Sequence, residues 1–181
     1  MPDIDRITEE DKKTIIDILK KAMQVEYDMI VNHLRIIDQI IDKGSAESLK
    51  FLDTLKRLGT DSLRHTTRVA SLIERMGGEP DFEAIVVDEM PDIKNMLVKQ
   101  LEKEKLAMSA YKDAKLIAQK SQAKAKGFFG RLLSRGEEIQ GDVNLKKSKV
   151  IFVLEGLQDE EWGHMKRVEL ALIQMNIQPE K

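Results

Sequence analysis

Glu161 and His164 are the two residues of this chain whose types and spacing most clearly suggest chemistry. Side chains three residues apart lie on one face of a helix. The same face is otherwise apolar, because it also carries Val150, Leu154, Leu157, Val168, Leu172 and Met175. A buried charge costs several kcal/mol unless it is paired or coordinated to a metal. The pattern therefore predicts that a partner meets both groups in the core, and a Glu-x-x-His that faces into a helix bundle is typical of carboxylate-bridged metal sites.

Long helices are needed to position these two residues. Apolar residues recur every three or four positions, without the alternation of a strand, over 9–43, 46–76, 91–122 and 142–176. Thr8 with Asp11 predicts a capped start for the first helix, and Gly77 predicts the end of the second. We therefore predict one all-α domain over 1–181, an antiparallel four-helix bundle. It has a long crossover between the second and third helices and an insertion over 114–141 between the third and fourth.

Each apolar stripe is interrupted near its middle by a residue that can bind a metal. These residues are Glu26 in the first helix, His65 in the second, Glu104 in the third, and Glu161 with His164 in the fourth. Four antiparallel helices can bring such positions to one level. Carboxylates and imidazoles without sulfur suit iron or manganese, with zinc as a further alternative. Iron is the first choice.

The chain resembles the ferritin-like superfamily of di-iron carboxylate proteins, in the style of bacterioferritin and rubrerythrin. The resemblance covers nearly the whole chain. It is carried by the sequence Asp-Glu-Glu-Trp-Gly-His at 159–164, by the stretch 65–80, and by Glu104 with Tyr111 seven residues later. It implies a ferritin-like bundle with two bound iron ions.

The resemblance also implies a role for each candidate ligand. Glu26 and His65 would serve one metal ion, Glu104 and His164 would serve the other, and Glu161 would bridge both.

The second helix departs from the family's pattern. The family has a bridging Glu three residues before the His of this helix, where this chain has Ser62. Asp61 lies on nearly the same face and is a candidate replacement ligand, although its side chain is shorter. Either Asp61 bridges, or the site is asymmetric and binds metal more weakly, most of all beside His65.

Two further polar residues share the inner stripes. His33 lies seven residues after Glu26, where the family often has Tyr, and it could be an extra ligand or could orient a carboxylate. A core histidine with no role at the metal is an equal alternative. Tyr111 is expected to donate a hydrogen bond to a ligand.

Composition narrows the class of protein. The chain has no cysteine, which excludes disulfides and thiolate metal sites. Its net charge of -2 gives no bias towards nucleic acid, so none is expected as a partner. There is no signal-peptide pattern and no apolar stretch close to the roughly 18 residues that span a bilayer, so a cytoplasmic location is expected.

The insertion has an unusual composition. Residues 114–136 carry six basic residues and no acidic one. Near its centre Phe128, Phe129, Leu132 and Leu133 can share one side of a short helix. Basic residues beside an apolar patch indicate a weak membrane-surface or protein contact. A mini-helix folded onto the bundle end, or a homodimer contact, is the favoured alternative.

The resemblance implies an oxidoreductase in which two Fe(II) ions react with dioxygen or peroxide. Because Ser62 replaces a ligand, a second hypothesis is a degenerate bundle with one metal or none that serves as a non-enzymatic interaction module. A third hypothesis, a membrane-surface hydroxylase, depends only on the insertion.

Overall fold

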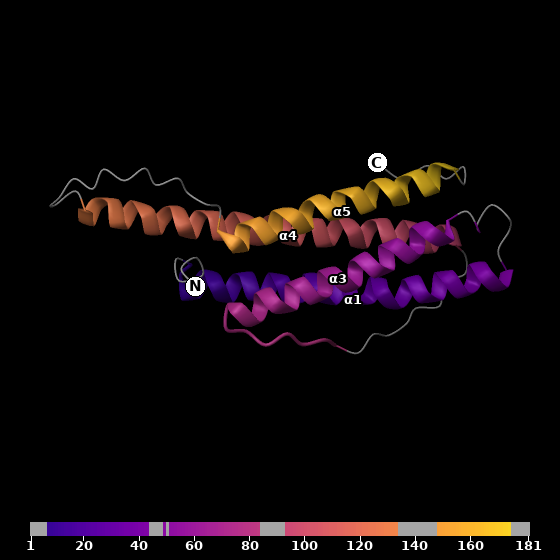
Figure 1. The fold of residues 1–181 in the computed structure, drawn as a ribbon, viewed down its shortest axis with the longest axis horizontal. Helices are drawn as coiled ribbons and strands as arrows, with labels where there is room; N and C mark the ends of the chain where they lie inside the picture. The colour runs from indigo at the N-terminus through magenta and orange to yellow at the C-terminus, as the bar shows by residue number, and fades with distance from the viewer. Residues whose placement is uncertain (1–6, 44–48, 50, 84–92, 134–147, 175–181) are drawn as a thin grey trace.

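The structure is a computed structural model that describes residues 7–43, 49, 51–83, 93–133 and 148–174, without the side chains of 125–133. The described residues form no strand, and their long helices are α1 (Glu9–Lys43), α3 (Leu52–Arg75), α4 (Ile93–Leu133) and α5 (Lys149–Gln174). Figure 1 shows α1 and α5 running in one direction, and α3 and α4 in the other. The prediction of an all-α four-helix bundle is therefore confirmed.

Two helix ends follow the predicted capping chemistry. The Thr8 hydroxyl accepts a hydrogen bond from the Asp11 N–H at 3.1 Å, which is the N-cap bond of a capping box, and donates one to the Asp11 carboxylate at 2.9 Å. The Thr8 N–H donates to the Ser121 hydroxyl instead of to Asp11. At the end of α3, Gly77 has a φ of 86°, which glycine adopts without strain. The Gly78 N–H donates to the Ile73 carbonyl and the Gly77 N–H to the Glu74 carbonyl, as in a Schellman motif.

The connection between α4 and α5 differs from the prediction. α4 continues to Leu133, beyond the predicted end at about residue 122, and Figure 1 shows its last turns extending past the other helices. The side chains of Phe128, Phe129, Leu132 and Leu133 lie outside the described part, as do residues 134–141 of the predicted insertion. The described part of α5 starts at Lys149, where the Ser148 hydroxyl accepts a hydrogen bond from the Ile151 N–H.

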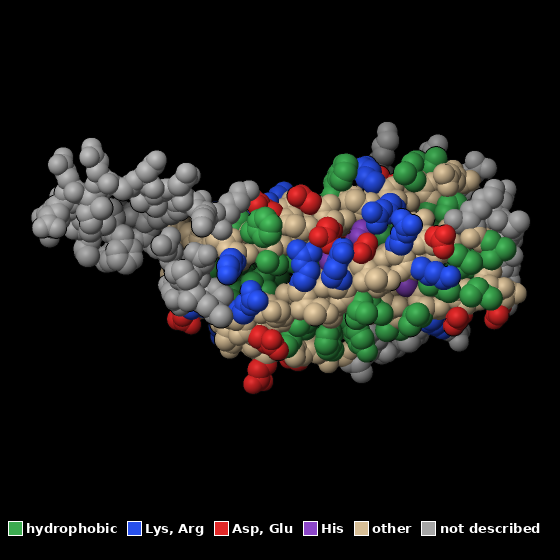
Figure 2. All heavy atoms as spheres, in the orientation of Figure 1, with side chains coloured by type: hydrophobic (Ala, Val, Ile, Leu, Met, Phe, Trp, Pro, Cys, Tyr) green, Lys and Arg blue, Asp and Glu red, His purple; other side chains and the backbone are tan. Residues whose placement is uncertain are grey.

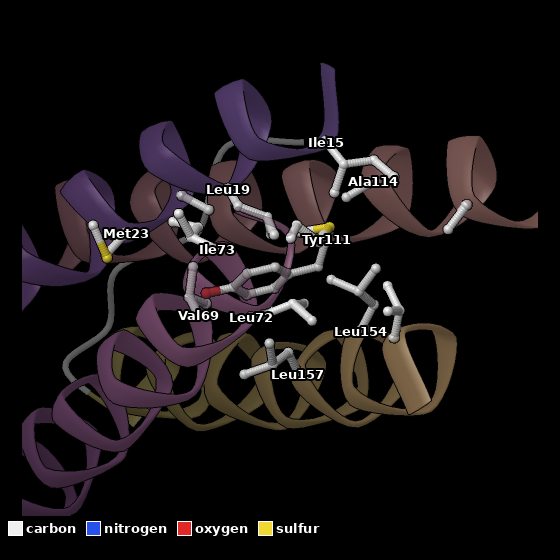
Figure 3. Close-up of a cluster of buried hydrophobic side chains, with 14 of the residues drawn as sticks. Ile15, Leu19, Met23, Val69, Leu72, Ile73, Tyr111, Ala114, Leu154 and Leu157 are labelled. Carbon is white, nitrogen blue, oxygen red and sulfur yellow. The ribbon is translucent and has the colours of Figure 1, made fainter. Parts of the chain in front are cut away.

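Buried apolar side chains form two clusters at the two ends of the bundle. The first cluster contains Leu19, Val69, Tyr111 and Leu154, among others (Figure 3). The second contains Ile36, Leu58, Leu101 and Leu172, among others. Between them, at mid-height, lies a layer of buried polar residues: Glu26, His33, Ser62, His65, Gln100, Glu104, Glu161 and His164. The apolar clusters therefore shield the polar layer from both ends.

The helices pack as two pairs. α1 packs along α3, α4 packs along α5, and α1 with α4 joins the pairs, whereas the backbones of α3 and α5 rarely approach each other. We call the line between these two helices the α3–α5 seam. None of the described helices is long and apolar enough to cross a membrane. The crossover between α3 and α4 is described only as far as Glu83, and the rest of it lies outside the described residues.

A pair of glycine substitutions tests the packing of this fold. A Cβ at Gly78 would lie 2.9 Å from the Ile73 Cγ2 and 3.0 Å from the Ile16 Cγ2, both on stiff branched side chains. Gly78→Ala is therefore expected to lower the free energy of unfolding by about 1–3 kcal/mol. At Gly163, within α5, no described atom lies within 4 Å of an added Cβ, so Gly163→Ala should raise stability by about 1 kcal/mol. Urea unfolding measures both, and equal effects of one sign would contradict the packing described.

Candidate metal centre

Five side chains from four helices converge at the middle of the polar layer. They are Glu26 of α1, His65 of α3, Glu104 of α4, and Glu161 and His164 of α5, and we call them the central cluster. All are at most 2% exposed. One atom each of His65, Glu161 and His164 can be chosen so that the three lie within 4.8 Å of one another, a spacing that allows a shared metal ion.

His65 presents one ring nitrogen to this cluster and the other to the outside. Its Nδ1 lies 3.1 Å from a Glu26 oxygen and 2.5 Å from a Glu161 oxygen. Its Nε2 lies 2.7 Å from a carboxylate oxygen of Glu160, which is one-third exposed. A histidine that binds metal through one nitrogen usually donates its other N–H to a carboxylate, which fixes the ring. The contacts of His65 fit that arrangement.

His164 repeats the pattern from the opposite helix. Its Nδ1 lies 3.4 Å from a Glu104 oxygen and 3.5 Å from a Glu161 oxygen. Its Nε2 lies 3.1 Å from a carboxylate oxygen of Asp61. The two imidazoles are stacked, with ring centroids 5.2 Å apart. Each histidine thus turns Nδ1 inward and has an acid of the opposite helix on Nε2.

The two outer carboxylates, Asp61 and Glu160, are held by arginines on the α3–α5 seam. Arg64 contacts both of them, at 3.0 and 2.9 Å. Arg68 lies 2.8 Å from Glu160, and Arg167 lies 3.6 Å from Asp61. Figure 2 shows acidic and basic side chains intermixed on the middle of this face, with histidine visible among them. The central cluster therefore lies close beneath a charged surface.

Glu26 and Glu104 are held by neutral donors. The Tyr111 hydroxyl donates to Glu26 Oε1 at 2.8 Å, and its role beside a metal ligand stays a prediction. Gln100 donates to Glu104 Oε1 at 2.5 Å and contacts the Met29 sulfur at 2.9 Å. In Glu104 one oxygen is fixed by Gln100 and the other lies 3.4 Å from the His164 Nδ1. In Glu26 the oxygen that accepts from Tyr111 also contacts the His65 Nδ1.

The inward-facing atoms are short of hydrogen-bond partners. Among the described residues none makes an aligned hydrogen bond to Glu26 Oε2, Glu104 Oε2, His164 Nδ1 or either oxygen of Glu161. Buried polar atoms are rarely left unpaired, and groups of them need a structural or functional explanation. Carboxylate oxygens and imidazole nitrogens are suitable donors to iron, manganese or zinc. The donor set therefore fits a bound metal.

The electrostatics of the cluster reflect crowded buried charge. Burial lowers the pKa of His65, but the adjacent Glu161 and Glu26 carboxylates outweigh it and raise that pKa to about 10. Burial likewise lowers the pKa of His164, and Glu104 with Glu161 raises it to about 10. Burial, with Glu104 alongside, raises the pKa of Glu161 to about 9. The carboxylates thus stabilise positive charge at this point.

Two residues of α3 that were predicted to act at the site, Asp61 and Ser62, take different positions. Asp61, predicted as a replacement bridging ligand, lies against the outer nitrogen of His164, because its position four residues before His65 turns it towards the seam. Ser62 is fully buried, and its hydroxyl makes no hydrogen bond to a described residue. Asp61 is therefore placed to orient a histidine.

His33 is buried beside the cluster and is 1% exposed. Neither ring nitrogen makes an aligned hydrogen bond to a described residue, although the backbone of Met29 lies close to the ring. Burial lowers its pKa to about 4, so the ring is neutral at pH 7. A Cβ at Gly59 would lie 3.4 Å from the His33 Cβ, so the ring fits where α3 has no side chain. Its role as a ligand or orienting group stays a prediction.

Glu160 and Gln100 were not predicted to act at the site. Glu160 contacts a histidine 95 residues away, which spacing along one helix cannot reveal. A signal was present all the same, because Asp61 and Glu160 each lie four residues before a histidine of the cluster. Gln100 lies four residues before Glu104, where one helix turn brings the two side chains together.

Comparison with known proteins agrees with this geometry at the level of the fold. No protein-family model matches the chain, and no curated protein matches it either. A solved structure described as that of ferritin-like, diiron-carboxylate proteins from Bacillus anthracis str. Ames is similar, with a TM-score of 0.65 and 17% sequence identity. The match covers 90% of this chain and 97% of that chain. The chain therefore has a ferritin-like fold, as predicted.

The outer carboxylates give a direct test of the site. Glu160→Gln and Asp61→Asn are each expected to weaken metal binding about 10–100-fold, because each removes the charge that orients a histidine. Asp159→Asn is the matched control, since Asp159 is exposed and lies next to Glu160. Competition with a coloured chelator measures affinity. Equal affinity in all three variants would mean that the outer carboxylates do not support a metal site.

Proposed function

We propose that the central cluster binds two iron ions and that the protein is an oxidoreductase acting with dioxygen or peroxide. The observation that carries this proposal is the set of carboxylates and imidazoles that converge from four helices in the buried layer, several of whose atoms make no aligned hydrogen bond to a described residue. The Bacillus anthracis structure is described as a diiron-carboxylate protein, which supports iron for this chain. Manganese and zinc are the alternative ions.

Each residue of the central cluster would have a distinct role in binding the two ions. Glu26 and His65 would hold one ion, Glu104 and His164 the other, and Glu161 lies between the two histidines and would serve both. Tyr111, Gln100 and the outer carboxylates keep these ligands in place. The apolar clusters above and below keep water from the site. The bound ions would supply the electrons for reduction of dioxygen or peroxide.

A second function is supported by one observation, the serine at position 62. A cluster with three carboxylates binds two ions less firmly than one with four, so a bundle with one ion or none could serve as a non-enzymatic interaction module. Counting the ions bound separates the two functions.

The test is anaerobic titration of the purified protein with Fe(II), followed by metal analysis and then exposure to dioxygen or peroxide. We expect about two ions per chain and oxidation of the bound iron that is faster than in buffer alone. Glu161→Gln is the control, because it keeps the shape of a buried ligand and removes its charge. Absence of bound iron, manganese and zinc would reject the metal proposal in favour of the second function. Binding without faster oxidation would reject the oxidoreductase.

A further inference from the structure

Ser62 occupies on α3 the position that Glu161 occupies on α5. Each lies three residues before a histidine of the central cluster, and both are fully buried. The surrounding residues repeat as well, because Asp61 and Glu160 orient the opposite histidines, and Arg68 and Arg167 contact these outer carboxylates. The two helices thus present equivalent positions, one with a carboxylate and the other with a hydroxyl.

The hydroxyl of Ser62 is itself unusual. Its Oγ is buried and makes no hydrogen bond within the described residues, although a serine can donate one and accept two. A buried hydroxyl without a partner costs about 1–3 kcal/mol. A negatively charged oxygen beside it would remove that cost, since a hydroxyl donates readily to an anion.

The balance of charge at the site also indicates that a negatively charged group is missing. The central cluster offers three carboxylates, and two divalent ions would bring four positive charges. The outer carboxylates are already in contact with Arg64, Arg68 and Arg167, so they are not free to compensate. One negative charge is missing from the interior, and the equivalence of the two helices places the missing group at Ser62.

We propose that a small carboxylate from solution completes the metal centre at Ser62, with the Ser62 hydroxyl donating a hydrogen bond to it. This inference rests on the proposed function, because the anion would bind only with the ions in place. The outer carboxylates and their arginines lie on the α3–α5 seam, where the side chain of Arg64 is 56% exposed. Positive side chains there would attract an anion and favour its entry. The ligand class is therefore a monocarboxylate, either free and small or the head of a longer molecule.

The experiment titrates the full-length protein, loaded with Co(II), with acetate, hexanoate and acetamide. Binding is measured by calorimetry and by the visible absorption of Co(II), so that no catalytic activity is needed. We expect about one acetate per chain with a change in the Co(II) spectrum, and no response to uncharged acetamide. Hexanoate tests the source: binding as tight as acetate indicates the head of a longer molecule, and weaker binding indicates a small free acid.

Substitutions at Ser62 locate the binding position. Ser62→Glu should abolish acetate binding and bind Co(II) more tightly, because it supplies the carboxylate from the chain. Ser62→Gln should also block acetate, by filling the same space, but without the gain in Co(II) affinity. Ser62→Ala should weaken acetate binding about tenfold through loss of one hydrogen bond to a charged group. Ser109→Ala, an exposed serine on α4, is the control and should bind acetate normally.

The outcomes separate this inference from the proposed function. If two Co(II) ions bind and acetate has no effect on heat or spectrum, the inference is overturned and the metal site stands. If acetate binds equally well to Ser62→Glu, the anion lies elsewhere and the inference is again overturned. Failure of the wild-type protein to bind Co(II), Fe(II) or Mn(II) would overturn both.

Discussion

Glu161→Ala is expected to abolish most metal binding while the four-helix bundle remains folded. Glu161 contacts both histidines of the central cluster, and its two oxygens make no aligned hydrogen bond within the described structure. Removal of one partner from a buried set of charges costs about 3–5 kcal/mol, which corresponds to 100-fold or more in affinity. Metal analysis after anaerobic loading, together with chelator competition, measures the loss.

Substitution of Glu161 should lower the affinity for metal without lowering the stability of the metal-free protein. In the absence of metal, burial opposes a charge on Glu161, as its raised pKa of about 9 indicates. A carboxyl with that pKa is neutral at pH 7, and Glu161→Gln keeps its volume and its neutrality, so the metal-free variant should be about as stable as the wild type. Glu102→Ala, on an exposed position of α4, is the control for both measurements. A variant that binds two ions normally would show that Glu161 is not a ligand.

The bounds of α1 and the burial of the central residues could be predicted from the sequence. The physical reason is the regular spacing of apolar residues along each helix. The stripes of the four helices place Glu26, His65, Glu104 and His164 at mid-height, where the structure brings them together. Apolar spacing says which face of a helix is buried, and a polar residue on that face must be compensated within the core. Neither inference requires knowledge of the loops.

The end of α4 shows where that reasoning fails. The apolar stripe fades after Ala118 and Ser121, because α4 there extends past the other described helices (Figure 1). The helix continues to Leu133 because Lys, Ala and Gln over 115–126 favour helix without tertiary contacts. Helix propensity, which periodicity ignores, was the missing information.

The outer carboxylates could not be assigned for a different reason. Asp61 and Glu160 act across the α3–α5 seam, each on a histidine of the opposite helix. Their role depends on how the two helices face each other, and residue spacing within one helix does not contain that information. Asp61 reaches the outer nitrogen of His164 because of its angle on α3, one position away from the fully buried Ser62, and its predicted role as a bridging ligand stays a prediction.

Metal loading is expected to raise the melting temperature substantially. The central cluster buries three carboxylates and two imidazoles, several of whose atoms make no aligned hydrogen bond to a described residue. Cations that bind there therefore stabilise the folded state and not the unfolded chain. At a free metal concentration 1,000 times the dissociation constant, the gain is about 4 kcal/mol. For a chain of this size that corresponds to about 8–16 °C. Differential scanning calorimetry with Mn(II), which avoids oxidation during the scan, measures the shift.

Two controls connect the stabilisation with the central cluster. A chelator should reverse it fully, because the effect depends on free metal and not on a change in the chain. Glu161→Gln should show little shift, since it lacks the carboxylate that serves both ions, whereas Glu102→Ala should shift as much as the wild type. An equal rise in Glu161→Gln would place the stabilising ions on the surface, where acidic side chains such as those of Glu9 and Glu10 are exposed. In that case the stability of the bundle would come from the two apolar clusters, and metal ions would add nothing in the polar layer.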